Sequence, residues 1–380
     1  MAQSEEEARR TAAVRGCERL LANPPKESIA AWMARLATEG AAAYDVSGPV
    51  DFYADEDGIV GEVERRTAEV LGTEAAAYFP SGTMAQQAAL RSWAGRTGNP
   101  TVALHPLAHI EQHERGALGV VSGLRTVHPT SAFRLPSAAE VRDFEEPFGT
   151  LALELPLRDA GFVLPSWDEL TATVEAARER DAVVHFDGAR LWECAPHFGH
   201  SLADIAGLAD SVYVSFYKSL GGISGAALAG SADFVAETKA WRHRYGGQLF
   251  AQFPAALSAL AGLRNELPRL PSYVAHAKAV ARGLREGLAA GGAVWPRTFP
   301  DEPHTHQFQL WLPYPADVLD EASLAQAEES RETLFGRSRF RQPGLPGLSV
   351  VEVTVAAEAL DWTESEVHDA AAAFARRLRS

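Results

Sequence analysis

Lys218 lies where an expected strand ends and a glycine turn begins, within Val214-Ser215-Phe216-Tyr217-Lys218-Ser219-Leu220-Gly221-Gly222. An amine that is desolvated at such a position has a lowered pKa and can act as a nucleophile near neutral pH. The chain holds only four lysines, and the other three, Lys26, Lys239 and Lys278, lie in patterns typical of solvated helix faces. Taken alone, Lys218 could also be an ordinary solvated loop lysine.

A second segment, Phe79-Pro80-Ser81-Gly82-Thr83-Met84-Ala85-Gln86, joins a short strand to the expected start of a helix. The unpaired backbone N–H groups of a helix N-terminus bind anions, and a glycine such as Gly82 lets a phosphate approach closely. Simple helix capping by Ser81 or Thr83 is the alternative, and it explains most isolated sequences of this type.

The third segment, His185-Phe186-Asp187-Gly188-Ala189-Arg190, follows the apolar pair Val183-Val184. Asp187, at the end of that strand, could hold a protonated ring nitrogen, and Arg190 could bind a carboxylate. A structural Asp–Arg pair is the alternative. Together the three segments supply an anion cradle, a carboxylate, an arginine and a Schiff-base lysine, which are the groups that bind pyridoxal phosphate.

The elements that must position these segments alternate between short strands and longer helices from about residue 70 to 260, as in Ala75–Phe79 and Ser211–Phe216. This alternation predicts an α/β fold with a mainly parallel sheet. Ligands of such sheets bind beyond the carboxyl ends of the strands, where all three segments are expected.

The pattern changes outside this region. A helix is expected over Lys26 to Glu39, and a long helix over Leu270 to Leu288 is followed by strands around His306 to Leu312 and Leu348 to Val355. We therefore expect an N-terminal helical segment (1–45), a large cofactor-binding domain (46–265) and a small α+β C-terminal domain (266–380).

The composition narrows the function. The chain has 380 residues, and 35 basic against 50 acidic side chains give a net charge of −15, which disfavours nucleic acids and anionic membranes as partners. Its apolar runs are too short to cross a bilayer. Two distant cysteines, Cys17 and Cys194, indicate reduced thiols, and the acidic N-terminus does not resemble a signal peptide. We expect a cytoplasmic protein without a metal site.

The chain resembles the threonine aldolase and β-eliminating lyase family of pyridoxal-phosphate enzymes. The matching segments are Pro80-Ser81-Gly82-Thr83, Ala108-His109 with Glu114 and Gly116, His185 to Leu191, Lys218 to Gly222, and Ala229-Gly230-Ser231. The resemblance implies the fold-type I architecture of the aspartate aminotransferases, with a mainly parallel seven-stranded sheet in the large domain. It also implies a homodimer or homotetramer with sites at the subunit boundary, where the loop from Asp51 to Gly58, with Tyr53, is the candidate for a wall lent to the neighbour.

The resemblance also implies roles for single residues. Lys218 would form the Schiff base, and Asp187 would pair with the pyridine nitrogen. Ser81, Gly82, Thr83 and Ser215 would hold the phosphate, His109 would stack on the ring and Arg190 would receive the substrate carboxylate. The candidates for the catalytic base are His109, Glu114 or an ordered water near them.

The implied activity is a carbon–carbon lyase of amino-acid metabolism that cleaves a β-hydroxy-α-amino acid to an aldehyde and glycine. A β-eliminating lyase with the same cofactor site is one alternative, and a catalytically idle binding or scaffold protein is another. Three segments depart from the family pattern: Cys17 to Asn23, His243 to Phe250, and Val350 to Val355, which lacks a second carboxylate-binding arginine. Either the amino acid is held differently, or one of Arg337, Arg339 and Arg341 replaces that arginine.

Overall fold

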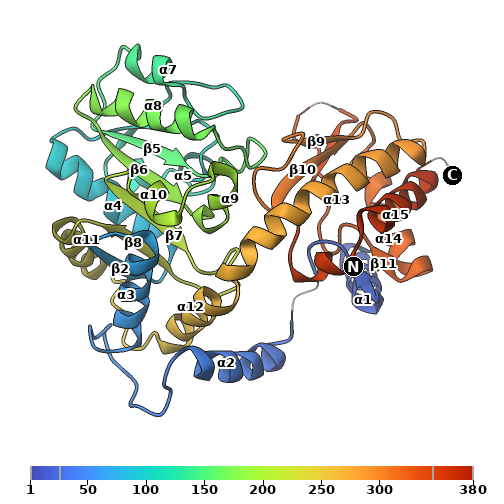
Figure 1. Ribbon diagram of the computed structural model, residues 1–380, viewed down its shortest axis with the longest axis horizontal. Helices are drawn as coiled ribbons and strands as arrows, with labels where there is room; N and C mark the ends of the chain where they lie inside the picture. The colour runs from blue at the N-terminus through green and yellow to red at the C-terminus, as the bar shows by residue number, and fades with distance from the viewer. Residues whose placement is uncertain (1, 25–26, 345, 379–380) are drawn as a thin grey trace. The chain divides into compact units, whose positions relative to one another are not determined.

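The computed structural model describes residues 2–24, 27–344 and 346–378. The chain forms two compact units, one made of Ile29–Leu270 and the other of Met1–Ser28 together with Pro271–Ser380. In Figure 1 the colours run from blue to yellow through the larger unit, while the smaller unit combines the orange and red elements with the first blue helix.

The larger unit is built on a seven-stranded sheet in the order β2-β8-β7-β6-β5-β3-β4. Its strands are β2 (Ala75–Phe79), β3 (Thr101–Ala103), β4 (Arg125–Val127), β5 (Thr150–Glu154), β6 (Val183–Gly188), β7 (Ser211–Ser215) and β8 (Ala226–Gly230). Neighbouring strands from β7 to β4 are parallel, whereas β8 is antiparallel to both β2 and β7. The predicted mainly parallel seven-stranded sheet is confirmed. Because β8 is antiparallel to both of its neighbours, β2 runs in the same direction as β5, β6 and β7. The carboxyl ends of these four strands therefore lie at the same edge of the sheet.

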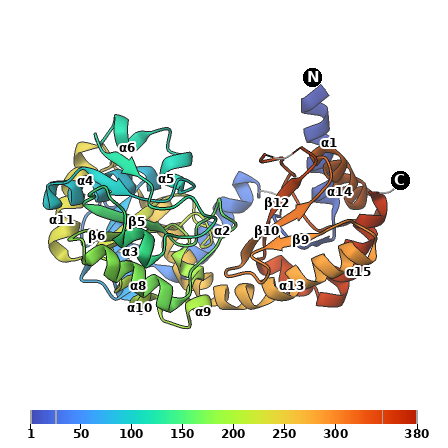
Figure 2. The same ribbon diagram turned by 90° about the horizontal axis from the view of Figure 1, so that it is seen from above.

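Helices cover both faces of this sheet. The helices of the larger unit are α2 (Ile29–Ala43), α3 (Ile59–Leu71), α4 (Gly82–Thr97), α5 (His109–Gln112), α6 (Ala117–Val120), α7 (Ala138–Arg142), α8 (Trp167–Arg178), α9 (Ala195–Phe198), α10 (Leu202–Ala206), α11 (Ala232–Arg244) and α12 (Phe253–Asn265), with 3₁₀ turns at η1 (Leu191–Glu193) and η2 (Leu267–Arg269). Of these, α2 packs on another helix, α12. Figure 2 shows α4 and α8 on opposite sides of the strands. The central strands β5 and β7 are therefore buried along their whole length, as is usual for parallel strands between two helical layers.

Local sequence explains where several helices begin. Ser166 caps α8 and forms a reciprocal pair of hydrogen bonds with Glu169, and Ser137 does the same for α7 with Glu140. Ser81 caps α4 by accepting a hydrogen bond from the Met84 amide.

The smaller unit is α+β, as predicted. Its helices are α1 (Ala2–Gly16), α13 (Leu270–Ala290), α14 (Ala316–Ser330), η3 (Ala357–Asp361) and α15 (Glu364–Arg377); its strands are β1 (Arg19–Leu20), β9 (Arg297–Phe299), β10 (Gln307–Leu312), β11 (Glu332–Thr333) and β12 (Ser349–Thr354). An antiparallel sheet in the order β12-β10-β9 packs over a core that includes Phe308, Phe335 and Phe374. No helix among the described residues is long and apolar enough to span a membrane.

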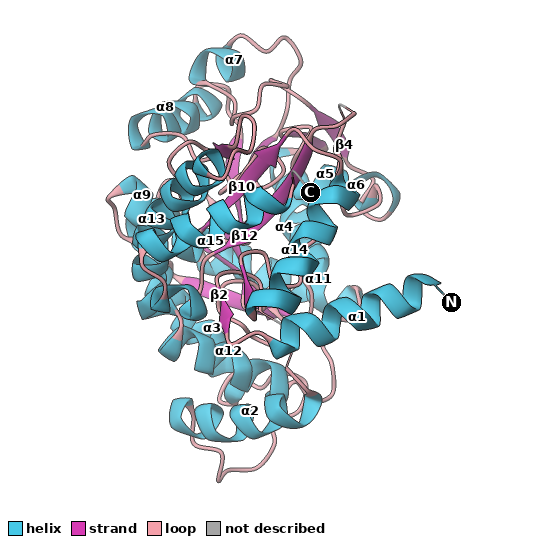
Figure 3. Ribbon diagram, turned by 90° about the vertical axis from the view of Figure 1, so that its right-hand side faces the viewer, coloured by secondary structure: helices cyan, strands magenta, loops and turns pink. Residues whose placement is uncertain are grey.

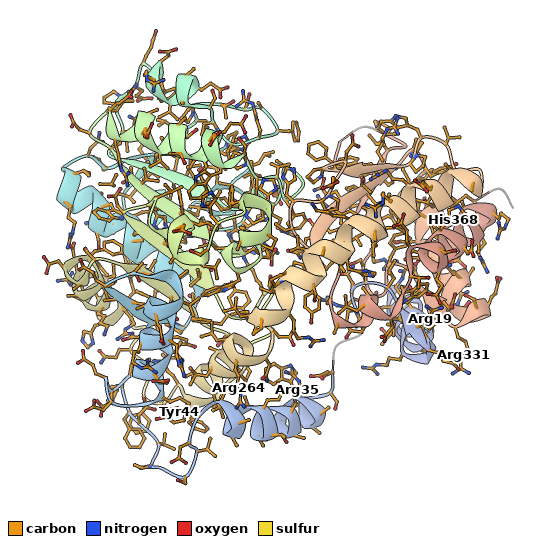
Figure 4. The ribbon with its side chains drawn as sticks, viewed as in Figure 1. Arg19, Arg35, Tyr44, Arg264, Arg331 and His368 are labelled. Carbon is orange, nitrogen blue, oxygen red and sulfur yellow. The ribbon has the colours of Figure 1, made fainter. Side chains whose placement is uncertain are left out.

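The N-terminal segment differs from the prediction because it is divided between the two units. β1 pairs with β11, and Arg9 on α1 binds Glu328 on α14, with 2.7 Å between Nη2 and Oε2, so residues up to Ser28 belong with the C-terminal chain. Arg19 and Arg331 accordingly lie in the same unit in Figure 4. The physical reason is long-range strand and ion pairing, which no local pattern reveals.

The helix expected over 26–39 is α2, and it begins at Ile29 and ends at Ala43. Lys26 lies outside the described residues. α2 packs against α12 of the larger unit, as Figure 3 also shows, and Figure 4 places Arg35 and Arg264 on these two helices.

Candidate functional site

Residues that follow β2, β6 and β7 meet in one cavity of about 270 Å³ at the shared carboxyl edge of the sheet. The predicted site residues that line it are Ser81, Gly82, Thr83, His109, Glu114, Asp187 and Lys218. Gln86, Tyr213, Tyr217, Ile223 and Ser224 also line it and were not predicted. Every one of these residues belongs to the larger unit.

The first turn of α4 forms one wall of the cavity. A helix of 16 residues begins here, so its unpaired N–H groups and positive dipole end face the space that an anion would fill. A Cβ built on Gly82 would overlap the hydroxyl group of Tyr213. Glycine is therefore required for steric reasons as well as for anion approach.

Gly82→Ala is expected to lower the free energy of unfolding by about 1–3 kcal/mol, because the methyl group must displace the Tyr213 ring. Anion binding at the first turn should weaken as well. The matched control is Gly95→Ala in the same helix, where nothing lies within 4 Å of the new Cβ. That variant should gain about 0.5–1 kcal/mol from helix propensity. Denaturant unfolding of both variants checks the pair, and equal effects would contradict the steric argument.

Lys218 enters the cavity from the turn after β7. Gly221 has a positive φ of 65°, and the Gly222 amide donates a hydrogen bond of 2.8 Å to the Phe216 carbonyl, which closes the turn. The Ser219 hydroxyl donates to the buried carboxylate of Glu193 and anchors the residue next to the lysine.

Burial lowers the pKa of the Lys218 amine to about 8, and the positive charge of Arg190 acts in the same direction. Asp187 and Glu154 oppose the shift without cancelling it. Two of the other lysines are held in ion pairs: Lys239 lies 2.7 Å from Glu64, and Lys278 lies 2.6 Å from Glu302. Among the lysines that the structure describes, Lys218 is thus the desolvated amine.

Asp187 is the last residue but one of β6 and is only 3% exposed, with its Oδ1 accepting a hydrogen bond from the Ala189 amide. Burial raises the pKa of Asp187, while the positive charge of Lys218 opposes the rise. A carboxylate in such a setting gains from a cationic partner, which a protonated ring nitrogen would be.

Two predicted residues lie beside the cavity and do not line it. Ser215 is buried and donates its hydroxyl hydrogen to the Ala189 carbonyl at 2.8 Å. Arg190 places its guanidinium 5.4 Å from the centre of the Phe162 ring, and its buried Nε has no hydrogen-bond partner among the described residues. Ser215 therefore supports the segment that carries Asp187 and Arg190.

His109 and Glu114 form a pair at the cavity. His109 begins α5, and its Nδ1 lies 3.6 Å from Oε1 of the buried Glu114 side chain. Gln87 Nε2 lies 3.5 Å from the other oxygen of Glu114. An imidazole held beside a buried carboxylate can accept and return a proton.

Glu154 is a buried acid that the sequence analysis missed. It ends β5 directly opposite Asp187, and its two oxygens accept hydrogen bonds from the amides of His109 (2.6 Å) and Arg158 (3.2 Å). Burial, together with repulsion from Asp187, raises the pKa of Glu154 to about 7. Its position at the end of a strand was visible in the sequence, but its pairing with Asp187 depends on the strand register.

Tyr213 and Tyr217 also line the cavity and were also missed by the sequence analysis. Their hydroxyls are hydrogen-bonded to each other, and burial raises the pKa of both phenols. Tyr213 lies in β7, and Tyr217 lies in the turn that follows it. The sequence did not indicate that the two hydroxyls meet, because their contact depends on the path of that turn.

The three arginines that are candidates to bind the substrate carboxylate differ in their surroundings. Arg339 binds Asp320 at 3.0 Å, and Arg341 lies 3.4 Å from Glu352. Arg337 is exposed and has no ion pair within the part of the chain that the structure describes. All three belong to the smaller unit.

The chain is similar to known proteins over most of its length. The family described as β-eliminating lyase matches residues 47–299. A low-specificity L-threonine aldolase of Escherichia coli (strain K12) is 30% identical over 245 residues, which are 63% of this chain and 72% of that enzyme.

Two solved structures extend the similarity to nearly the whole chain. A protein from Listeria monocytogenes, proposed to be an L-allo-threonine aldolase, is 30% identical and has a TM-score of 0.87 over 98% of this chain and 99% of its own. A protein from Exiguobacterium, proposed to be an aromatic amino acid β-eliminating lyase or threonine aldolase, is 34% identical, with a TM-score of 0.86 over 97% of this chain and 99% of its own. The fold-type I architecture implied by the sequence is confirmed.

Proposed function

Because the chain belongs to the β-eliminating lyase family, we propose that its cavity holds pyridoxal 5'-phosphate and that the protein is a threonine-aldolase-like lyase. It would cleave a β-hydroxy-α-amino acid to an aldehyde and glycine. The observation that supports this most directly is the desolvated amine of Lys218 in the same cavity as Asp187 and the free N-terminus of α4.

The residues present fit this cofactor. The first turn of α4, where a Cβ at Gly82 would overlap Tyr213, offers N–H groups to a phosphate, and the hydroxyls of Ser81 and Thr83 lie in the same wall. Asp187 offers a buried carboxylate to the ring nitrogen, and Lys218 offers an amine for covalent attachment. Bound there, pyridoxal phosphate supplies an electron sink for the carbon whose bond breaks.

The side chains of the protein then have separate tasks. Lys218, with a pKa of about 8, is partly neutral near pH 7 and can attack a carbonyl or carry a proton. Asp187 keeps a proton on the ring nitrogen. His109 would stack on the ring, and its imidazole, 3.6 Å from Glu114, would take the proton from the β-hydroxyl group of the substrate. Arg190, whose buried Nε has no hydrogen-bond partner among the described residues, would receive the substrate carboxylate.

Product analysis tests this assignment. Cofactor-loaded protein should release glycine and an aldehyde from threonine or phenylserine. Pyruvate and ammonia from serine or cysteine derivatives, without aldehyde release, would instead establish the β-eliminating alternative. If neither set of products forms although Lys218 binds the cofactor, the protein is an idle binding member of this fold.

We also propose that a second copy of the chain covers the apolar surface around α2 and the loop that follows it. Ile29 is 81% exposed and Met33 67% exposed, and Phe52 and Phe250 stack at 4.4 Å while remaining half exposed. The Tyr53 amide donates to the Phe250 carbonyl at 2.9 Å, which fixes this loop as an apolar ridge. Such patches mark protein interfaces. Sedimentation equilibrium should give at least twice the mass of one chain, and a monomer mass would exclude the interface.

The cytoplasm is the proposed location. Cys17 and Cys194 are both free thiols, which a reducing compartment preserves.

A further inference from the structure

A buried hydrogen-bonded chain of side chains leads from the interior of the larger unit to the cavity. Trp93 Nε1 lies 2.7 Å from Ser211 Oγ, and Ser211 Oγ lies 2.7 Å from His185 Nδ1. His185 Nε2 lies 2.8 Å from Gln86 Oε1. All four residues are buried, and Gln86 is the member that lines the cavity.

The direction of each hydrogen bond follows from donor and acceptor chemistry. The indole of Trp93 only donates, so Ser211 Oγ accepts from it. Burial lowers the pKa of His185 to about 3, so the imidazole is neutral and has one donor and one acceptor nitrogen. Two arrangements of the remaining protons are then possible.

In the first arrangement the Ser211 hydroxyl donates to Nδ1, and Nε2–H donates to the Gln86 carbonyl oxygen. In the second, Nδ1–H donates to Ser211, and the Gln86 amide is rotated so that its nitrogen faces His185. In the second arrangement Ser211 Oγ accepts from both Trp93 and His185, so its own buried hydrogen has no acceptor among the described residues. A buried donor without an acceptor costs free energy. The first gives an acceptor to every side-chain donor of Trp93, Ser211 and His185, so it is the arrangement that the fold selects.

The amide nitrogen of Gln86 therefore faces away from His185. Gln86 is only 1% exposed, and its Nε2 has no hydrogen-bond partner among the described residues. Gln86 stands one turn along α4 from Gly82 and shares the cavity wall with Gly82 and Asp187. A buried amide that is locked at one end and unpaired at the other has the features of a donor reserved for a ligand.

We propose that Gln86 is a further cofactor-binding residue, whose amide nitrogen donates a hydrogen bond to an oxygen of the cofactor in this cavity. The proposal rests on the proposed function, because the cofactor named there provides the acceptor. Its acceptor oxygens are those of the phosphate and of the ring hydroxyl. The His185–Ser211–Trp93 chain is the device that fixes the orientation of the amide.

The test uses equilibrium binding to cofactor-free protein, so it does not depend on turnover. Gln86→Glu keeps an oxygen for His185 Nε2–H and replaces the donor with an acceptor. Gln86→Met removes both functions. We expect the Kd for pyridoxal phosphate to rise at least about tenfold in both variants. The matched control is Gln326→Met, because Gln326 is an equally buried glutamine that does not line the cavity and whose amide nitrogen already donates to the Ala370 carbonyl. Its Kd should stay within about twofold of wild type.

Binding of pyridoxal, which lacks the phosphate, identifies the acceptor. If Gln86 donates to the phosphate, Gln86→Glu should bind pyridoxal as wild type does. If it donates to the ring hydroxyl, binding of both compounds should weaken alike. A wild-type Kd for pyridoxal phosphate in Gln86→Glu would overturn the inference and leave Gln86 as a support for His185 alone, even if Gln86→Met fails to fold. Failure of wild type itself to bind pyridoxal phosphate would instead refute the proposed function.

Discussion

Lys218→Ala is expected to abolish covalent attachment of the cofactor and to lower turnover by about 10⁴-fold, because the variant loses both a nucleophile and a proton carrier. The loss should be visible as the disappearance of the absorption band of the lysine-linked cofactor and of the peptide labelled after borohydride reduction. The control is Lys278→Ala. Lys278 and Glu302 form an exposed ion pair, which contributes little to stability. Retention of the label in Lys218→Ala would contradict the assignment.

Lys218 also predicts a pH dependence that requires no cofactor. The pKa of its amine is about 8 in the folded protein, against an ordinary value of 10.5. Below pH 8 the amine is protonated in the folded and in the unfolded protein, and burial of its charge lowers the stability of wild type. Between pH 8 and 10.5 it stays protonated only in the unfolded protein, so the stability of wild type rises with pH. Cofactor-free Lys218→Met, which carries no charge, should therefore be more stable than wild type at pH 7, and this advantage should fade towards pH 10.5. Denaturant unfolding at several pH values checks it, and an advantage independent of pH would contradict a buried charge.

Asp187→Asn is expected to retain the cofactor on Lys218 but to lower turnover by about 10²–10³-fold, because a neutral amide does not stabilise a protonated ring nitrogen. The substitution also removes the negative charge opposite Glu154, so the pKa of Glu154 should fall from about 7. The pH dependence of the cofactor's absorption band reports both changes.

The control for Asp187→Asn is Asp159→Asn. Asp159 is hydrogen-bonded to His113, with 2.7 Å between Oδ2 and Nε2, and does not line the cavity. Removal of its charge therefore changes the nearby electrostatics without removing a group that would contact the cofactor ring. We expect turnover within about tenfold of wild type for this variant. Equal losses in the two variants would show that Asp187 acts through general electrostatics and not through the ring nitrogen.

Glu154 affects the site in two ways: it positions His109, and it shares a buried negative charge with Asp187. Because both oxygens of Glu154 accept backbone hydrogen bonds, this residue holds the start of α5, and with it His109, against the end of β5. Two adjacent carboxyl groups in a buried place resist simultaneous ionisation, so Glu154 retains its proton more readily than an ordinary glutamate. The negative charge of the pair then lies mainly on Asp187, the carboxylate that would face the ring nitrogen of the proposed cofactor.

The sequence by itself determined the fold class and predicted half of the residues that meet in the cavity. Strand patterns that end in Ser81-Gly82-Thr83, Asp187 and Lys218 were sufficient, because the carboxyl ends of strands that run in one direction meet at one edge of the sheet. The structure added that β2 runs in the same direction as β7 because the strand between them, β8, is antiparallel to both.

The tertiary structure alone decided the rest. The division of residues 1–45 between two units depends on the pairing of β1 with β11, whose residues are more than three hundred positions apart. The pairing of Glu154 with Asp187 depends on strand register, and the orientation of the Gln86 amide depends on His185, 99 positions away. Local patterns report which residues can form strands, helices and charges. Burial and hydrogen-bond partners come from segments distant in the chain, and these set the pKa of a carboxyl group and the direction in which an amide points.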